Sequence, residues 1–224
     1  MAIELRRGAG LAIGAGAALA AGREVLGRLR EEDLSGQVAL VTGGSRGVGS
    51  VTARLLAERG AAVVITYRDK ERRAREVVEE IAALGSEGMA VQSDMTDATS
   101  VTAMFADIEE RFGRLDIVVL NASGGLEKDA ASDYAMRLNR DAQLALVEGA
   151  LPLMREGGRV VFVTSHLAHF HGQKPVMPEY EIVASSKRAG EIALRERMPE
   201  LQKAGVSLVV VSGDLSTAPS RRNC

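Results

Sequence analysis

The stretch Val38-Ala39-Leu40-Val41-Thr42-Gly43-Gly44-Ser45-Arg46-Gly47-Val48-Gly49 decides the fold of this 224-residue chain. A short apolar run leads through a glycine-rich turn into sequence that favours a helix through about Arg59. Glycine is needed where a chain turns sharply out of a strand and brings its backbone close to a diphosphate. Free N–H groups at the helix start then hold the negative charge. The turn therefore predicts a nucleotide-binding site rather than an ordinary flexible connection.

Apolar runs and helical stretches alternate along the rest of the chain, which is typical of a parallel sheet covered by helices. We therefore predict one doubly wound α/β domain over residues 35–224, with about six strands and helices on both faces. The expected strands are Val38–Thr42, Ala62–Thr66, Met89–Gln92, Asp116–Leu120, Arg159–Thr164 and Val206–Val211. The expected helices after the first are Lys70–Leu84, Asp97–Phe112, Asp133–Met154 and Pro178–Ala204.

Composition excludes several classes of protein. Hydrophobic residues make up 46% and charged residues 26% of the chain, which is the balance of a soluble globular protein. The formal net charge of −2 leaves no basic surplus for a phosphate backbone, so we expect no nucleic-acid partner. The single cysteine, Cys224, excludes an internal disulfide framework and a cysteine-based metal site. We expect a cytoplasmic protein without a bound metal.

Residues 1–34 differ in composition from the rest of the chain. Arg6 and Arg7 precede a glycine- and alanine-rich run that is too short for a membrane-spanning helix. Three interpretations compete: a mobile leader, an interfacial membrane anchor with Arg23, Arg28 and Arg30 on its flank, and a cleaved signal peptide. Membrane contact through this segment therefore stays open.

The spacing Thr-Gly-x-x-x-Gly-x-Gly resembles the short-chain dehydrogenase/reductase family, and further motifs follow in that family's order over about residues 36–213. They are Asp94 after the third strand, Asn121-Ala122 after the fourth, Asn139 on the next helix, Ser165 closing the fifth strand and Lys187 on the helix after it. The resemblance implies a Rossmann-type domain that binds a dinucleotide. The implied cofactor-binding residues are Thr42, Gly43, Ser45, Arg46, Gly47, Val48, Gly49, Tyr67, Arg68, Asp94, Met95, Asn121, Ala122 and Lys187.

Charge at the end of the second strand predicts which dinucleotide binds. An acidic residue there would bond the ribose hydroxyls of NAD and repel a 2′-phosphate. This chain has Tyr67-Arg68 there instead, and Arg46 lies in the glycine-rich turn. Two guanidinium groups favour a phosphate, although Asp69 lies next to Arg68. We therefore predict NADP(H) in preference to NAD(H).

The resemblance also implies a catalytic set, from which the chain departs at one position. Family members carry a tyrosine four residues before the lysine, where both side chains share a helix face and the ammonium stabilises the phenolate. Here Val183 occupies that position, and the nearest phenol is Tyr180, seven residues before Lys187. Seven helical residues turn about 700° and rise about 10.5 Å, so Tyr180 faces the side of the lysine from farther away. The implied catalytic residues are Ser165, which orients a carbonyl, Lys187, Asn139 and provisionally Tyr180.

Three hypotheses follow from this departure. A distorted first turn at Pro178 lets Tyr180 act as proton donor, or the chain binds cofactor and reduces poorly or not at all. In the third, a histidine of the segment 165–171 transfers the proton. His166, His169 and His171 also invite a metal interpretation, but their loop spacing without a nearby carboxylate argues against it.

We therefore expect an oxidoreductase that transfers a hydride between a nicotinamide and a ketone or secondary alcohol. The alternative is a non-catalytic dinucleotide-binding protein. The polar stretch after Val211 predicts a chain that lacks the family's substrate-selecting end and leaves the sixth strand as an exposed edge. A homodimer or homotetramer is expected through the helices flanking the fifth strand, where the small residues Ala135, Ala142, Ala145 and Gly149 would permit close approach.

Overall fold

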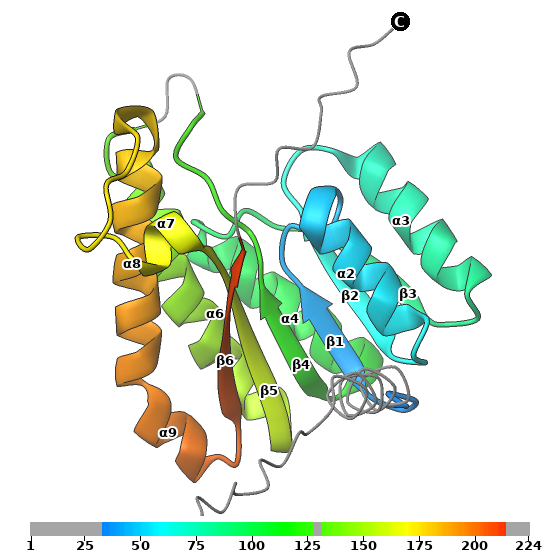
Figure 1. Cartoon of the computed structure of the whole chain (residues 1–224). Helices are drawn as coiled ribbons and strands as arrows, with labels where there is room; N and C mark the ends of the chain where they lie inside the picture. The colour runs from blue at the N-terminus through cyan, green and yellow to red at the C-terminus, as the bar shows by residue number, and fades with distance from the viewer. Residues whose placement is uncertain (1–32, 128–130, 214–224) are drawn as a thin grey trace, which may run out of the picture. The chain divides into compact units, whose positions relative to one another are not determined.

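The central sheet of the protein is parallel, as a computed structural model of the chain shows (Figure 1). The structure describes residues 33–127 and 131–213. Within them, six strands lie in the order β3-β2-β1-β4-β5-β6. This order runs outward from β1 in both directions and confirms the predicted doubly wound sheet. The strands are β1 (Val38–Val41), β2 (Ala62–Tyr67), β3 (Gly88–Gln92), β4 (Leu115–Leu120), β5 (Met154–Ser165) and β6 (Ser207–Gly213).

Helices cover the two faces of the sheet through two separate apolar clusters. Successive side chains of a strand point to opposite faces, so Leu40 joins one cluster while Ala39 and Val41 join the other. The cluster of Leu40 includes residues of α4 (Ala98–Phe112), α6 (Ala142–Ala150), α8 (Glu181–Glu196) and α9 (Met198–Lys203). The cluster of Ala39 includes residues of α2 (Gly47–Ala57) and α3 (Glu71–Ala83).

The edge strand β6 is covered on one face only among the described residues. Leu208 and Val210 pack against the cluster beneath α8, whereas Val209 and Val211 are 44% and 47% exposed. β6 is the last strand of the described sheet, as expected, and the prediction that its edge is uncovered stays a prediction, because residues 214–224 lie outside the described ranges.

The expected helix Asp133–Met154 is confirmed as one continuous helical segment, although not all of its turns are α-helical. Within it, α5 (Tyr134–Met136) leads directly into a π-helical turn (Arg137–Asp141), α6 and a final 3₁₀ turn (Leu151–Leu153). Proline at position 152 provides no N–H for a continued α-helix, which explains the final 3₁₀ turn. Strand β5 then begins at Met154, five residues before the predicted start, and its register against β4 shifts between Leu115 and Ile117.

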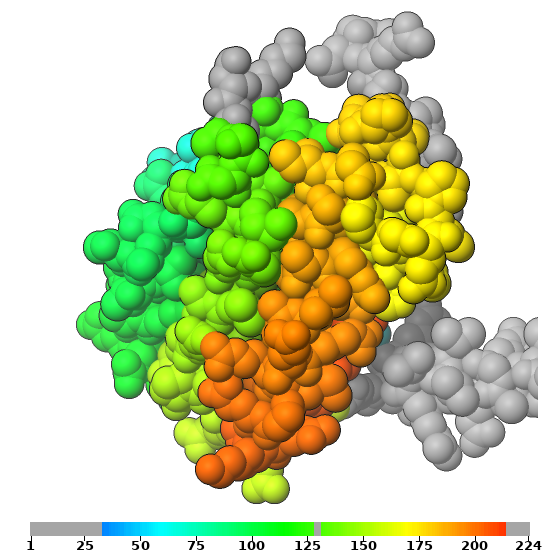
Figure 2. Space-filling model, turned by 90° about the vertical axis from the view of Figure 1, so that its left-hand side faces the viewer, coloured from blue at the N-terminus to red at the C-terminus, as the bar shows by residue number. Residues whose placement is uncertain are grey.

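The expected helix Pro178–Ala204 divides into three helical elements. A 3₁₀ turn (Pro178–Tyr180) precedes α8, and Arg197 separates α8 from α9. Proline at position 199, in the first turn of α9, favours a new helix start there. Figure 2 shows α8 and α9, in orange, crossing the face of the molecule beside the segment that contains α6.

The four small residues expected at a subunit interface have another role in the chain itself. Ala135 and Ala142 are buried at 1% and 5% exposure, and Gly149 faces the ring of Phe105 in α4. Only Ala145 of the four is exposed. Ala135 and Ala142 are therefore not available to a partner chain, because their small size serves packing within this one, whereas the assignment of Ala145 and Gly149 to an interface stays a prediction. A homodimer or homotetramer stays a prediction.

The expectations for both chain ends concern residues that the structure does not describe. Residues 1–32 of the predicted leader and residues 214–224 of the polar tail lie outside the described ranges. Leu34 is 3% exposed and its N–H donates to the carbonyl of Arg59, so the folded unit includes one residue more than the predicted boundary at 35. None of the described helices is long and apolar enough to cross a membrane.

Gly190 lies where α8 crosses the π-helical turn, and a side chain there should destabilise the fold. A Cβ at Gly190 would lie 2.0 Å from the carbonyl oxygen of Asn139, which is backbone and has no other rotamer. We expect Gly190→Ala to lower the free energy of unfolding by about 3 kcal/mol, measured by chemical denaturation.

Gly213→Ala is the matched control. A Cβ at Gly213 would meet nothing within 4 Å, so this variant should unfold like the unchanged protein. Equal stability of both variants would show that α8 does not approach the π-helical turn this closely.

Candidate active site

The glycine-rich turn brings the end of β1 to the start of α2. A Cβ at Gly49 would lie 2.5 Å from the carbonyl oxygen of Gly43, so only glycine allows the helix to start against the turn. Arg46 precedes α2 and makes no side-chain cap, and the first turn of α2 contains no acidic residue. The first N–H groups of α2 and the positive end of its dipole are therefore available to a negatively charged group.

Buried hydrogen bonds join this turn to the end of β4. The hydroxyl of Thr42, whose residue is fully buried, accepts from the N–H groups of Asn121 at 2.9 Å and Ala122 at 3.0 Å. The same hydroxyl donates to the carbonyl of Val119 at 3.2 Å. The side-chain amide of Asn121 donates back to the carbonyl of Thr42 at 2.9 Å. These bonds fix the two sides of the opening between β1 and β4.

A cleft of about 640 Å³ opens at this edge of the sheet. It brings together most of the residues expected to bind a cofactor: Gly43, Ser45, Arg46, Gly47, Val48, Tyr67, Arg68, Asp94, Met95, Asn121 and Ala122. Thr42 and Gly49 are buried behind it. Sequence reasoning missed the other lining residues as binding residues: Thr66, Asp69, Lys70, Ser93, Ser123, Glu127, Tyr134 and Leu138. Several of them follow strand ends, a position that the sequence alone indicates, whereas Tyr134 and Leu138 lie on the predicted helix Asp133–Met154.

The charges in the cleft are both basic and acidic. Nε of Arg68 donates to Asp69 at 2.9 Å, and Nη1 of Arg68 donates to the hydroxyl of Tyr134 at 2.6 Å. Asp94 accepts from the N–H and the hydroxyl of Thr96 at 2.9 and 2.7 Å. Burial opposes ionisation of Asp94, but these two bonds and the nearby arginines lower the pKa of its carboxyl below the usual value. Asp94 is therefore a carboxylate at neutral pH.

Ser165 and Tyr180 meet at the far end of the same sheet edge. Their hydroxyl oxygens share a hydrogen bond of 3.1 Å. Ser165 ends β5 and caps α7 (His166–His169), where its Oγ accepts from the N–H of Ala168 at 3.2 Å. Tyr180 is the last residue of the 3₁₀ turn before α8. The irregular start of this helix thus brings the phenol to the serine, as the first of the three hypotheses requires.

Lys187 and Val183 lie one helical turn apart on α8. The ammonium of Lys187 donates to the carbonyl of Val163 in β5 at 3.1 Å, and burial lowers the pKa of this lysine to about 8. Val183 is 4% exposed, and its side chain lies against Gly125 in the segment after β4. Position 183 therefore contributes an apolar surface without a proton to transfer.

Asn139 joins the segment after β4 to α8. Its side-chain amide donates to the carbonyl of Gly124 at 2.8 Å and to the hydroxyl of Ser186 at 2.9 Å. Asn139 lies in the π-helical turn and is 1% exposed. It holds the residue before Lys187 against the loop that follows β4, which favours a structural contribution to the site.

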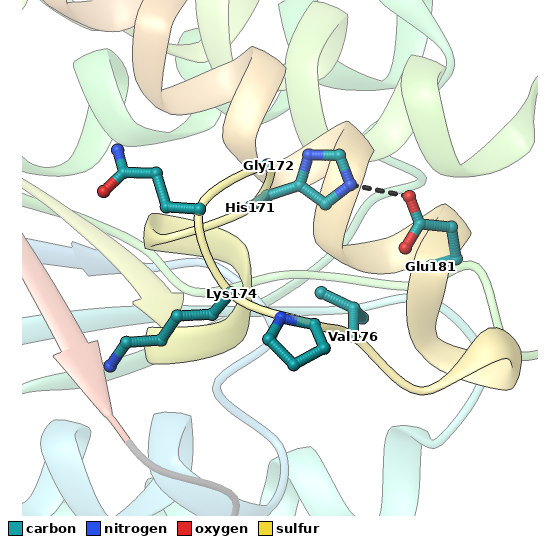
Figure 3. A pocket seen from close by; sticks show the side chains of 7 residues that line it. His171, Gly172, Lys174, Val176 and Glu181 are labelled. Atoms are coloured by element: carbon teal, nitrogen blue, oxygen red, sulfur yellow. Dashed lines mark hydrogen bonds and ion pairs between the residues drawn. The ribbon is translucent and has the colours of Figure 1, made fainter.

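Two of the three histidines near the site pair with carboxylates of α8. Nδ1 of His169 lies 2.8 Å from Oε2 of Glu191, and Nε2 of His171 lies 2.7 Å from Oε1 of Glu181. The expectation that no carboxylate lies close to these histidines is therefore wrong, because α8 folds back beside the loop. Figure 3 shows the His171–Glu181 pair at a hollow of about 470 Å³ formed by residues 171–176 and Glu181.

Glu191 is a fully buried carboxylate that sequence reasoning missed. Its side chain is 0% exposed and contacts Arg195 Nε at 2.9 Å and Arg188 Nη1 at 3.4 Å in addition to His169. Burial raises the pKa of a carboxyl, but the bonds from His169 and Arg195 outweigh it and leave the pKa of Glu191 lowered. The cluster joins α8 to α7, the helix that Ser165 caps.

Replacing Glu191 should destabilise the protein in a pH-dependent way. We expect Glu191→Gln to lower the free energy of unfolding at neutral pH by about 2 kcal/mol, because His169 and Arg195 lose their buried charged acceptor. Since folding lowers the pKa of Glu191, its stabilisation is present above the unfolded value near ~4.3 and is lost as the pH falls through the folded value. The difference between variant and unchanged protein should therefore shrink in acid, measured by denaturation at several pH values.

Glu200→Gln provides the control for this substitution. Glu200 pairs with Arg197 at 3.0 Å while half exposed, and an exposed pair contributes little. A Glu191→Gln variant as stable as Glu200→Gln would contradict the buried cluster.

The parallel sheet, the glycine-rich turn and the cleft at the carboxyl ends of the strands together form a Rossmann-type α/β fold. A family model described as short chain dehydrogenase matches residues 37–221. The chain therefore belongs to the short-chain dehydrogenase family, which confirms the resemblance drawn from its motifs.

Named relatives and solved structures agree with this membership. The hydroxynaphthalene reductase-like protein Arp2 of Metarhizium majus is 40% identical over 164 residues, 70% of this chain and 60% of that protein. Versicolorin reductase stcU of Emericella nidulans is 37% identical over 168 residues, 72% of this chain and 62% of that protein. A short-chain dehydrogenase from Burkholderia cenocepacia in complex with NADP matches with a TM-score of 0.73 and 35% identity, covering 81% of this chain and 75% of that one. The chain spans about three fifths of the length of these two curated relatives.

Proposed function

We propose that this chain is an NADP(H)-dependent oxidoreductase that interconverts a ketone and a secondary alcohol. The observation that carries the proposal is the hydrogen bond between Tyr180 and Ser165, on the same sheet edge as the dinucleotide cleft. Tyr180 supplies the phenol that position 183 lacks. The rival function, binding of a dinucleotide without catalysis, is favoured by Val183 and is an outcome of the test below.

The residues of the cleft fit the proposed cofactor. The first N–H groups of α2 carry no side-chain cap and can receive a diphosphate, and Arg46, Arg68 and Lys70 provide cations for a further phosphate. Arg46 is exposed, which leaves its guanidinium accessible from the cleft. The binding of NADP by the Burkholderia relative supports this choice over NAD.

The proposed roles of the catalytic residues come from the family resemblance, and the contacts of these residues support them. The bound dinucleotide would supply or accept a hydride. The hydroxyl of Ser165 orients the substrate carbonyl, and the hydroxyl of Tyr180, bonded to it, gives the carbonyl oxygen its proton during reduction. The buried ammonium of Lys187 binds the ribose of the dinucleotide and favours negative charge nearby. Asn139 keeps α8 in place through Ser186.

We infer the substrate class from the relatives alone. The two curated relatives are named for reduction of a hydroxynaphthalene and of versicolorin. Ketones fused to aromatic rings are therefore the first substrates to test, together with simple secondary alcohols and ketones.

Removal of the Tyr180 hydroxyl should stop turnover without weakening cofactor binding. We expect Tyr180→Phe to lower kcat for ketone reduction by about 100-fold or more, since a positioned proton donor contributes on this scale. NADPH consumption gives the rate, and quenching or enhancement of NADPH fluorescence gives the binding. Glu179→Gln, an exposed residue of the same 3₁₀ turn, is the matched control and should keep full activity.

Two results would contradict the assigned role of Tyr180. Unchanged turnover in Tyr180→Phe would exclude this phenol as proton donor. NADPH binding without turnover by the unchanged protein across the ketone panel, with activity restored by Val183→Tyr, would favour the non-catalytic rival.

The lowered pKa of Lys187 predicts a pH limit on activity. The ammonium loses its proton as the pH rises through about 8, so kcat/KM for NADPH, which reports the free enzyme, should decline around that pH. Lys187→Arg keeps its charge at higher pH and should move the decline upward. Identical pH profiles of the two proteins would show that another group sets the limit.

A further inference from the structure

One hydrogen bond spans the cofactor cleft between two separate elements. Arg68 follows β2 on one wall, and Tyr134 begins α5 on the other. Nη1 of Arg68 donates to the hydroxyl of Tyr134 at 2.6 Å, and the guanidinium carbon lies 6.0 Å from the centre of the phenol ring.

The other contacts of Arg68 do little to hold its guanidinium group in one position. The carbonyl of Arg68 accepts from the amide of Gln92 at 2.9 Å, which holds the backbone but not the guanidinium. The ion pair with Asp69 joins two side chains that are 46% and 61% exposed, and such pairs contribute little. An arginine side chain has a large rotamer entropy, whereas a half-buried tyrosine is comparatively rigid. Tyr134 is therefore the more effective of the two side-chain partners in fixing the guanidinium.

The two bonds also decide which part of the guanidinium faces outward. Nε of Arg68 donates to Asp69 and Nη1 donates to Tyr134. Among the described residues, Nη2 of Arg68 therefore has no hydrogen-bond partner. A planar guanidinium recognises a phosphate by direction as well as by charge. Holding two of the three nitrogens therefore restricts where the third can present its N–H groups.

We propose that Tyr134 is a positioning residue that holds Arg68 for the 2′-phosphate and thereby raises the preference for NADP(H) over NAD(H). The proposal rests on the proposed cofactor and adds the residue that sets its recognition. It assigns Tyr134 no part in proton or hydride transfer. The effect of Tyr134 should then appear only when both Arg68 and a 2′-phosphate are present.

Equilibrium binding to the full chain tests this without any turnover. In Tyr134→Phe, which removes only the hydroxyl, we expect the Kd of NADPH to rise about tenfold, on the scale of one hydrogen bond to a charged group. The Kd of NADH should change by less than about twofold, since NADH carries no 2′-phosphate. Nicotinamide fluorescence measures both, and thermal unfolding verifies that the variant is folded.

A double-mutant cycle with Arg68→Met shows whether Tyr134 acts by positioning Arg68 or by changing the shape of the cleft. Arg68→Met should weaken NADPH binding by itself, and Tyr134→Phe added to it should have no further effect. Equal weakening of NADPH and NADH, additive effects in the double variant, or an unchanged or lowered NADPH Kd in Tyr134→Phe would each overturn the proposal. If the unchanged protein bound neither NADPH nor NADH, both the proposed cofactor and the proposed role of Tyr134 would be wrong. If it bound NADPH and NADH with equal affinity, only the proposed preference for NADP(H), and with it the role of Tyr134, would be wrong.

Discussion

The buried hydroxyl of Thr42 is the interaction on which the site depends. It joins the end of β1 to the backbone of Asn121 and Ala122 and so fixes the separation of two neighbouring strands at their carboxyl ends. Because the glycine-rich turn follows one strand and the loop over the cleft follows the other, one buried group defines both walls. A polar group this deep is tolerated because it both accepts and donates a hydrogen bond.

Helix α8 extends this frame to the reacting end of the site. Val183, Lys187 and Glu191 follow at four-residue spacing and therefore lie along one face of the helix. The first packs against the segment after β4, the second binds a carbonyl of β5, and the third holds α7 through His169. One helix thus determines where Ser165 and its surroundings lie relative to the sheet. Tyr180 enters from the 3₁₀ turn just before this helix, which explains how a phenol outside the usual position reaches the serine.

The sheet and the cleft could be predicted because they depend on local sequence. Apolar runs gave the strands, and the glycine spacing gave the turn, since both reflect constraints within a few residues. The end of α8 at Arg197 could have been predicted, because Pro199 favours a new helix start there. The π-helical turn that contains Asn139 could not, because it packs against Gly190 of α8, which is distant in the sequence. The partners of Glu191 were missed for the same reason: burial of a carboxylate is decided by tertiary packing. The sequence placed Tyr180 in the site only under one of three hypotheses, and it did not predict the hydrogen bond between Tyr180 and Ser165.

Tyr180, and not the residue at position 183, should contact the substrate oxygen. A crystal structure of the protein with NADP⁺ and a bound ketone or alcohol would show this contact. The hydroxyl of Tyr180 should lie within about 2.6–3.2 Å of the substrate oxygen, beside Ser165. A substrate oxygen that contacts a histidine of residues 166–171, or only water, with Tyr180 turned away from Ser165, would contradict it.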